Sequence, residues 1–174
     1  YATYRNGDIP VEMIVYTQTS PDIVGVLRQV ERFGAASGEG TGVSLTVDQA
    51  SGFSWPWAWY LRDYTRTGYI DYSSAATSAP DESVLIVHAN NKPDDDGVLA
   101  ARFSPGMRIS HRRWFPETYR GLTLGKFLGG FVDRAVWRRS MDYFLYRKLQ
   151  TQLGSEDAYV YFSEDFPVGF TPSQ

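Results

Sequence analysis

The residues best suited to ligand chemistry lie in a short aromatic run, Ser54-Trp-Pro-Trp-Ala-Trp-Tyr-Leu-Arg-Asp-Tyr64. Its candidate binding residues are Trp55, Trp57, Trp59, Tyr60, Arg62 and Asp63. The three tryptophans alternate, and the first and third are also one helical turn apart. One interpretation is an aromatic platform with a charged rim, suited to stacking on a sugar ring or a lipid headgroup. The other is structural: the indoles wedge a helix against a sheet, and Arg62 and Asp63 form an ion pair.

A second concentration of such residues follows in Ile109-Ser-His-Arg-Arg-Trp-Phe-Pro-Glu-Thr-Tyr119. Its candidates are His111, Arg112, Arg113 and Trp114. The guanidinium group is well shaped for phosphate or carboxylate, which favours an anion-binding role. The alternative is a strand edge whose charge is neutralised by acidic neighbours. We predict that this segment and the aromatic run border one concave surface, where aromatic faces meet a sugar and arginines meet its phosphate.

The sequence carries no complete catalytic or metal-binding motif. It has no cysteine and only two histidines, which removes thiolate nucleophiles and three-histidine zinc sites. No serine-hydrolase elbow, phosphate loop, dinucleotide fingerprint or H-E-x-x-H motif is present. The net charge is −3 and the pI about 5.4, which argues against a nucleic-acid partner. We therefore expect no catalytic residue, no metal and no cofactor in this chain.

Several segments must position these residues. Apolar runs rich in strand formers predict strands at 12–17, 43–47, 68–72 and 83–88. Ser20-Pro21-Asp22 is typical of a helix start, and apolar residues at helical spacing continue to Phe33, where Gly34 would end the helix. A second helix is predicted over the aromatic run. Further along, the pattern predicts a strand at 107–115, helix from 122 to 149 with a break near residues 129–130, and a strand at 158–162.

The alternation of strands and helices in the first half predicts an α/β fold: a single domain with a mostly parallel sheet and helices packed on it. We expect that domain to span residues 12–174, with residues 1–11 as a lead-in. Ligand crevices of such sheets lie beyond the carboxyl ends of the strands. Here those ends are 17–20, 48–54, 71–73 and 88–91. No stretch reaches the roughly 18 consecutive apolar residues of a membrane span.

Three segments carry a resemblance to a known group of proteins: Pro10-Val-Glu-Met-Ile-Val-Tyr-Thr-Gln-Thr-Ser-Pro-Asp22, Trp55-Pro-Trp-Ala-Trp-Tyr-Leu-Arg-Asp-Tyr64 and Trp114-Phe-Pro-Glu117. They resemble the soluble domain of flippase-activity-associated, mannosyltransferase-like membrane proteins of Chloroflexus-type bacteria and archaea. That group is similar to the protein O-mannosyltransferase and oligosaccharyltransferase superfamily. The likeness covers Pro10 to about Asp165, and the aromatic run is its most specific part.

The resemblance implies a parent glycosyltransferase that moves a sugar from a polyprenyl-phosphate carrier to an acceptor outside the cell. This chain would be its extracytoplasmic accessory domain, non-catalytic alone, held at the membrane face by segments outside the chain. Its partners would be the membrane part of the same polypeptide and a lipid-linked sugar or glycan acceptor. The catalytic carboxylate, and any divalent metal, would belong to that membrane part. The alternatives are a stand-alone carbohydrate- or protein-binding module and a free-standing α/β enzyme.

Overall fold

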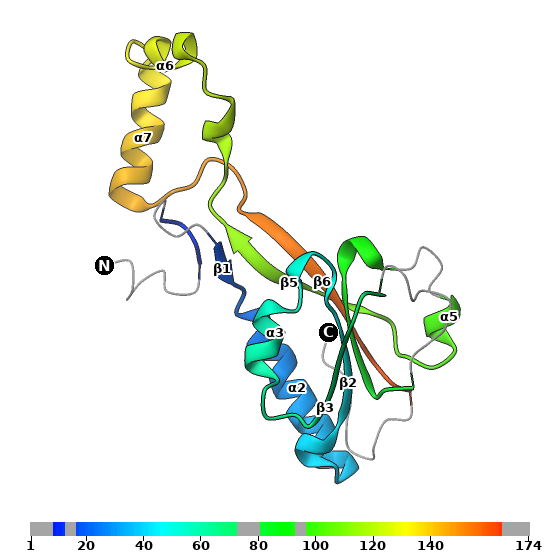
Figure 1. The fold of residues 1–174 in the computed structure, drawn as a ribbon. Coiled ribbons are helices and arrows are strands. Elements are labelled where there is room, and N and C mark those ends of the chain that lie inside the picture. The colour runs from blue at the N-terminus through cyan, green and yellow to red at the C-terminus, as the bar shows by residue number, and fades with distance from the viewer. Residues whose placement is uncertain (1–8, 13–16, 73–80, 93–96, 165–174) are drawn as a thin grey trace. The chain divides into compact units, whose positions relative to one another are not determined.

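The computed structural model describes residues 9–12, 17–72, 81–92 and 97–164 (Figure 1). The strands are β1 (Thr17–Thr19), β2 (Ser44–Asp48), β3 (Arg66–Ile70), β4 (Val84–His88), β5 (Met107–Trp114) and β6 (Gly154–Phe162). The α-helices are α2 (Asp22–Ser37), α3 (Trp55–Tyr60), α5 (Gly97–Ala100), α6 (Leu124–Gly130) and α7 (Arg134–Tyr146). Short 3-10 turns lie at Gly40–Gly42, Ala50–Gly52, Ala89–Asn91 and Thr118–Gly121.

The strands form a mixed sheet in the order β1-β5-β6-β4-β2-β3, so the prediction of a mostly parallel α/β sheet is wrong. Parallel pairing is limited to β2 with β3 and β2 with β4. The pairs β1–β5 and β4–β6 are antiparallel. Parallel neighbours need a crossover connection, and α3 lies in the connection between β2 and β3. On its other edge β4 pairs with β6, which runs antiparallel to it.

The chain groups into two compact units. Unit 1 comprises Tyr1–Ser20 and Arg112–Ser155, and unit 2 comprises Pro21–His111 and Glu156–Gln174. The predicted strands at 43–47, 68–72 and 83–88 correspond to β2, β3 and β4, which are neighbours in unit 2. Of the predicted strand at 12–17, residues 13–16 lie outside the described part, and β1 begins at Thr17.

The main core of unit 2 lies between the sheet and helices α2 and α3. From α2 it takes Ile23, Val26, Val30 and Phe33, and from α3 and its end it takes Trp57 and Leu61. Each of the five residues of β4 is buried, as its continuous apolar run predicts. Alternate β4 side chains enter different clusters: Val84 and Ile86 join the main core, whereas Leu85 and Val87 join a second cluster. That second cluster also contains residues Tyr72, Leu99, Phe103 and Tyr161.

Helix α2 runs past the predicted end at Gly34 and stops at Gly38, which has a left-handed φ of 77°. Gly34 serves a different purpose. A Cβ atom at this position would overlap the carbonyl oxygen of Gly40, far inside van der Waals contact. The glycine therefore allows the helix to lie against the turn that leads into β2.

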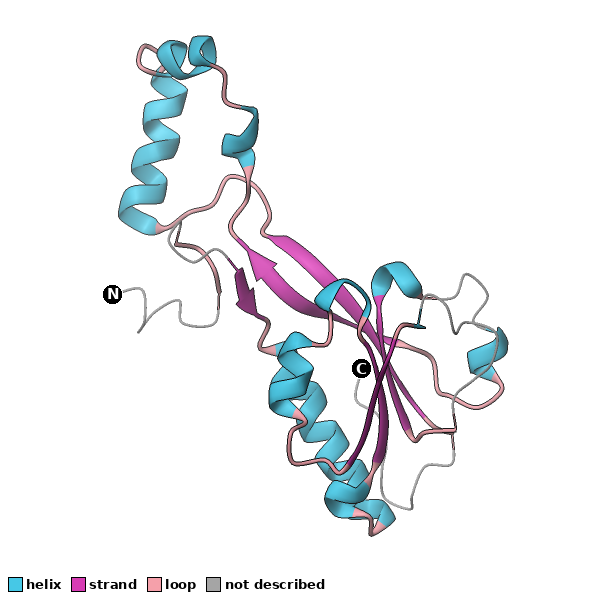
Figure 2. Ribbon diagram, viewed as in Figure 1, coloured by secondary structure: helices cyan, strands magenta, loops and turns pink. Residues whose placement is uncertain are grey.

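Unit 1 contains β1 and the segment Arg112–Ser155, which includes helices α6 and α7. Residues 131–133 join the two helices (Figure 2). The predicted helical break near residues 129–130 is confirmed, because α6 ends at Gly130. Asp133 caps α7 by accepting a hydrogen bond from the Ala135 amide. The Tyr143 hydroxyl donates to the Val11 carbonyl at 2.9 Å, which ties α7 to the N-terminal part of unit 1.

Candidate functional site

A fully buried carboxylate, Asp48, lies at the carboxyl end of β2 in unit 2. Its Oδ1 accepts the Ala50 amide at 2.9 Å and the Tyr72 amide at 3.3 Å. Its Oδ2 accepts the His88 amide at 3.2 Å and the Asn91 side-chain amide at 2.7 Å. Four donors from three segments therefore meet at this carboxylate, and a buried charge needs such partners to be tolerated.

This arrangement follows from the parallel pairing of β2 with β3 and β4, which brings the carboxyl ends of the three strands together. Three of the four strand ends singled out in the sequence, at 48–54, 71–73 and 88–91, meet at Asp48. Burial and, secondarily, the charge of Asp48 raise the pKa of the Tyr72 hydroxyl above its usual value of 10.0. The hydrogen bonds to Asp48 hold together the segments at the carboxyl ends of β2, β3 and β4.

A second carboxylate, Glu156 of β6, lies between the two histidines. Its Oε1 is 3.1 Å from His88 Nε2, and its Oε2 is 3.0 Å from His111 Nδ1. Because His88 Nδ1 accepts the Asn90 amide, the His88 proton belongs on Nε2 and is donated to Glu156. Phe53 packs on His111 with ring centroids 4.1 Å apart and meets His88 edge-on. Both histidines are buried, so this trio is better placed for holding strands together than for meeting a substrate.

The three tryptophans of the aromatic run divide between core and surface. Trp57 is fully buried, and its indole lies nearly parallel to the His111 ring at 6.0 Å, as the structural interpretation predicts. Trp55 and Trp59, one turn apart on the same helix, are 74% and 64% exposed. The buried indole anchors α3 as the structural interpretation predicts, whereas the other two are exposed to solvent, and the aromatic platform stays a prediction.

Arg62 and Asp63 lie beside the exposed indoles. The Arg62 guanidinium carbon is 4.6 Å from the centre of the Trp59 ring, and its Nη1 donates to the Trp59 carbonyl at 2.9 Å. Arg62 Nε is 3.8 Å from Asp63 Oδ2, and both side chains are exposed. Tyr60 is partly buried against the main core. We call Trp55, Trp59, Arg62 and Asp63 the tryptophan rim.

The second predicted segment divides between the two units. His111 lies in unit 2, fully buried, whereas Arg112, Arg113 and Trp114 lie in unit 1. There they pair with Thr19, Gln18 and Thr17 of β1, and all three are partly buried. The common concave surface with the aromatic run therefore stays a prediction.

Sequence reasoning missed Glu156 and the role of Asp48. A period-2 signal points to Glu156, because Ala158, Val160 and Phe162 of the same strand all enter the main core of unit 2. Glu156 falls on that same side of β6, two residues before them. A carboxylate on the core-facing side of a strand needs polar partners, and in this chain the two histidines supply them.

The described residues contain no group of three or more His, Cys, Asp or Glu side chains arranged to hold a metal ion. Within the same residues, no helix is both long and apolar enough to cross a membrane. Comparison of the chain with protein-family models, with curated proteins and with solved structures found no match.

Proposed function

We propose that the chain is a non-catalytic carbohydrate-binding domain whose tryptophan rim stacks against a sugar. The observation that carries the proposal is the exposure of Trp55 and Trp59 on one side of a helix anchored by buried Trp57. Exposed indoles on a short helix that is anchored in the core match the weakly polar faces of a pyranose ring, and they lose little side-chain freedom on binding. A helix held by its own buried indole also needs no rearrangement to present them.

The charged members of the rim add polar contacts. Arg62 lies over the Trp59 ring and keeps further N–H groups for hydroxyl or phosphate oxygens. Asp63 accepts hydrogen bonds from sugar hydroxyls. This combination of apolar faces with a few polar groups is the composition expected of a small-ligand site.

The buried histidines argue for a binding role over a catalytic one. Both His88 ring nitrogens are engaged, one by the Asn90 amide and the other by Glu156. His111 is fully buried under Phe53 and Trp57. A general base needs to reach a substrate proton within hydrogen-bond distance, and neither ring is placed to do so.

The sequence resemblance supports a biological setting for this binding domain. In that setting it is the accessory domain of a membrane-bound glycosyltransferase that uses a polyprenyl-phosphate sugar, and it positions the lipid-linked sugar or the glycan acceptor. A full-length gene that encodes no membrane-spanning segments would remove the setting and leave the alternative, a stand-alone carbohydrate-binding module.

The test is a glycan array screen followed by calorimetric titration of the strongest oligosaccharide. Trp59→Ala and Trp55→Ala are each expected to weaken binding by about 1.5 kcal/mol, or roughly tenfold in Kd. Tyr146→Ala, which removes a similarly exposed ring in unit 1, should leave binding unchanged. If no glycan binds, or if both tryptophan variants bind like the unmodified chain, the proposal fails.

A further inference from the structure

The α6–α7 segment, residues 120–148 of unit 1, exposes an unusual amount of apolar surface. Of the fifteen large hydrophobic side chains that are exposed among the described residues, eleven lie between Leu122 and Tyr146. Neither α6 nor α7 contains a buried residue. Exposed apolar surface that is concentrated in one place marks an interaction site. Helices this short are also marginal unless their apolar side chains are covered.

The same segment is strongly basic within an acidic chain. It carries seven Arg or Lys residues and two Asp, a formal charge of +5, whereas the whole chain has −3. The remaining residues therefore carry −8. Two of the cations are paired within unit 1, Arg120 with Glu117 and Arg147 with Glu12. The other five are all exposed, and they are Lys126, Arg134, Arg138, Arg139 and Lys148.

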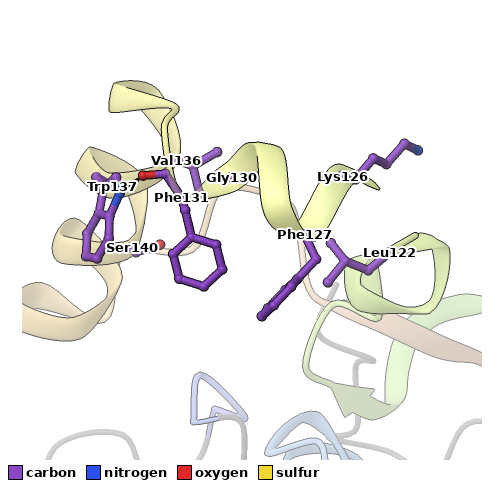
Figure 3. A pocket seen from close by; sticks show the side chains of 8 residues that line it. All are labelled: Leu122, Lys126, Phe127, Gly130, Phe131, Val136, Trp137 and Ser140. Atoms are coloured by element: carbon purple, nitrogen blue, oxygen red, sulfur yellow. Dashed lines mark hydrogen bonds between the residues drawn. The ribbon is translucent and has the colours of Figure 1, made fainter. Parts of the chain in front are cut away.

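Figure 3 shows the apolar part of this surface from close by. A groove of about 360 Å³ between the two helices is lined by Leu122, Phe127, Phe131 and Trp137, and Lys126 also lines it. The Trp137 indole nitrogen donates to the Phe131 carbonyl at 2.9 Å, which fixes the orientation of that ring. The groove is therefore lined mainly by apolar side chains, together with one cation, Lys126.

Along α7 the helical spacing separates apolar from basic residues. Trp137, Met141 and Phe144 recur at intervals of four and three residues, so they share one side of the helix. Arg134 and Arg138 fall next to that side, whereas Arg139 falls on the opposite side. The linker to α6 presents Val132, which is 88% exposed. Apolar and aromatic residues on one side, with arginines beside them, are the pattern of a helix that lies in a membrane interface.

We propose that the α6–α7 segment docks on the surface of an anionic lipid bilayer. Its apolar side chains would enter the boundary between headgroups and acyl chains, Trp137 would lie at headgroup depth, and the exposed cations beside the apolar residues would meet lipid phosphates. At 13 residues α7 is shorter than the roughly 20 residues of a membrane-spanning helix, so it lies along the interface. The charge of the segment favours this occupant over pairing with the same segment of a second copy, because that contact would bring +5 against +5.

The test uses the purified chain in a flotation assay with two kinds of vesicle, phosphatidylcholine alone and an equimolar mixture of phosphatidylcholine and phosphatidylglycerol. We expect binding to the anionic vesicles, little to the neutral ones, and loss of binding as salt is added. A chain with net charge −3 prefers an anionic surface only through a local cationic region. Each cation near the surface contributes about fivefold, so Arg134→Gln with Arg138→Gln should weaken binding roughly twenty-five-fold.

Insertion is tested separately from charge. Val132→Asn, which leaves the charge of the segment unchanged, should reduce binding without changing the helix content measured by circular dichroism. Brominated lipid should quench the fluorescence of the chain, and Trp137→Phe should remove that quenching. A variant with both Trp55→Ala and Trp59→Ala is the matched control, because it removes two exposed indoles from unit 2. It should float normally while losing sugar binding, so failure of this proposal is distinct from failure of the proposed function.

Two outcomes would overturn the proposal. One is equal or absent binding to the two kinds of vesicle. The other is a dimer in analytical ultracentrifugation that Val132→Asn converts to monomer while flotation stays unaffected, which would assign the surface to a second copy of the chain.

Discussion

The role of Asp48 in holding the strand ends together is tested by replacing one of its carboxylate oxygens with an amide NH2 group. Asp48→Asn keeps the shape of the side chain but replaces an acceptor by a donor. If the new amide nitrogen replaces Oδ2, the Asn91 side chain can turn its own oxygen toward it, but the His88 backbone N–H loses its acceptor. If it replaces Oδ1, the backbone N–H groups of Ala50 and Tyr72 both lose theirs.

The first orientation is less costly and sets the expected magnitude. Losing one buried hydrogen bond to a charge costs about 1.5–3 kcal/mol. The two bonds that remain on the other oxygen weaken because the acceptor is now neutral. Part of this loss is offset because no charge needs to be buried. We expect Asp48→Asn to lower the free energy of unfolding by about 2–4 kcal/mol.

The measurement is urea unfolding followed by tryptophan fluorescence and circular dichroism, with Asp63→Asn as the matched control. Asp63 is exposed and changes by the same atoms, so its variant should stay within about 0.5 kcal/mol of the unmodified chain. If the two variants unfold at the same urea concentration with the same slope, Asp48 does not hold the strand ends together and this reasoning fails.

Two further predictions concern unit 2. Gly34→Ala should destabilise the chain by about 2 kcal/mol or more in urea unfolding, because the added methyl meets the Gly40 carbonyl. Gly25→Ala in the same helix meets nothing and should stabilise the chain by about 0.5–1 kcal/mol. A stabilising Gly34→Ala would contradict the close approach of the helix to the turn. Because the folded state raises the pKa of Tyr72, its contribution to stability is fully present below about pH 10 and is lost as the pH rises through the folded pKa. Urea unfolding from about pH 9 to about pH 11 should therefore show stability falling less steeply in Tyr72→Phe, and equal slopes would refute that coupling.

Local patterns predicted the elements better than their pairing. The apolar run at 83–88 indicated a strand buried on both faces, and β4 is one. The helix start at Ser20-Pro21-Asp22 is also confirmed. The direction of β6 had no local signal, because its partner β4 lies about 70 residues earlier in the chain. Strand direction there is decided by long-range packing, which a helix–strand alternation read over short windows does not contain.

The part of the candidate site that depends on local helical spacing was predictable, and the part that depends on strand pairing was not. The spacing of Trp55 and Trp59 indicated a shared helical face, and both are exposed on α3. The charged run at 111–113 was read as one group, although strand alternation sends neighbours to opposite faces. In the structure His111 is fully buried, and alternation separates Arg112 from it. Arg113 shares the side of His111 but belongs to unit 1, where it pairs with Gln18.

The late position of β6 has a consequence for how the chain reaches this fold during synthesis. Strand β4 is made early, yet the neighbour on one of its edges, residues 158–162, follows about 70 residues later. At ribosomal rates of 5–20 residues per second, that edge waits for about 4–14 s. For this interval a wholly apolar Val-Leu-Ile-Val segment has an unpaired backbone edge, which is the kind of surface that aggregates. Fast translation of the α6–α7 segment, or a chaperone that covers β4, would shorten the exposure and raise the yield of folded chain.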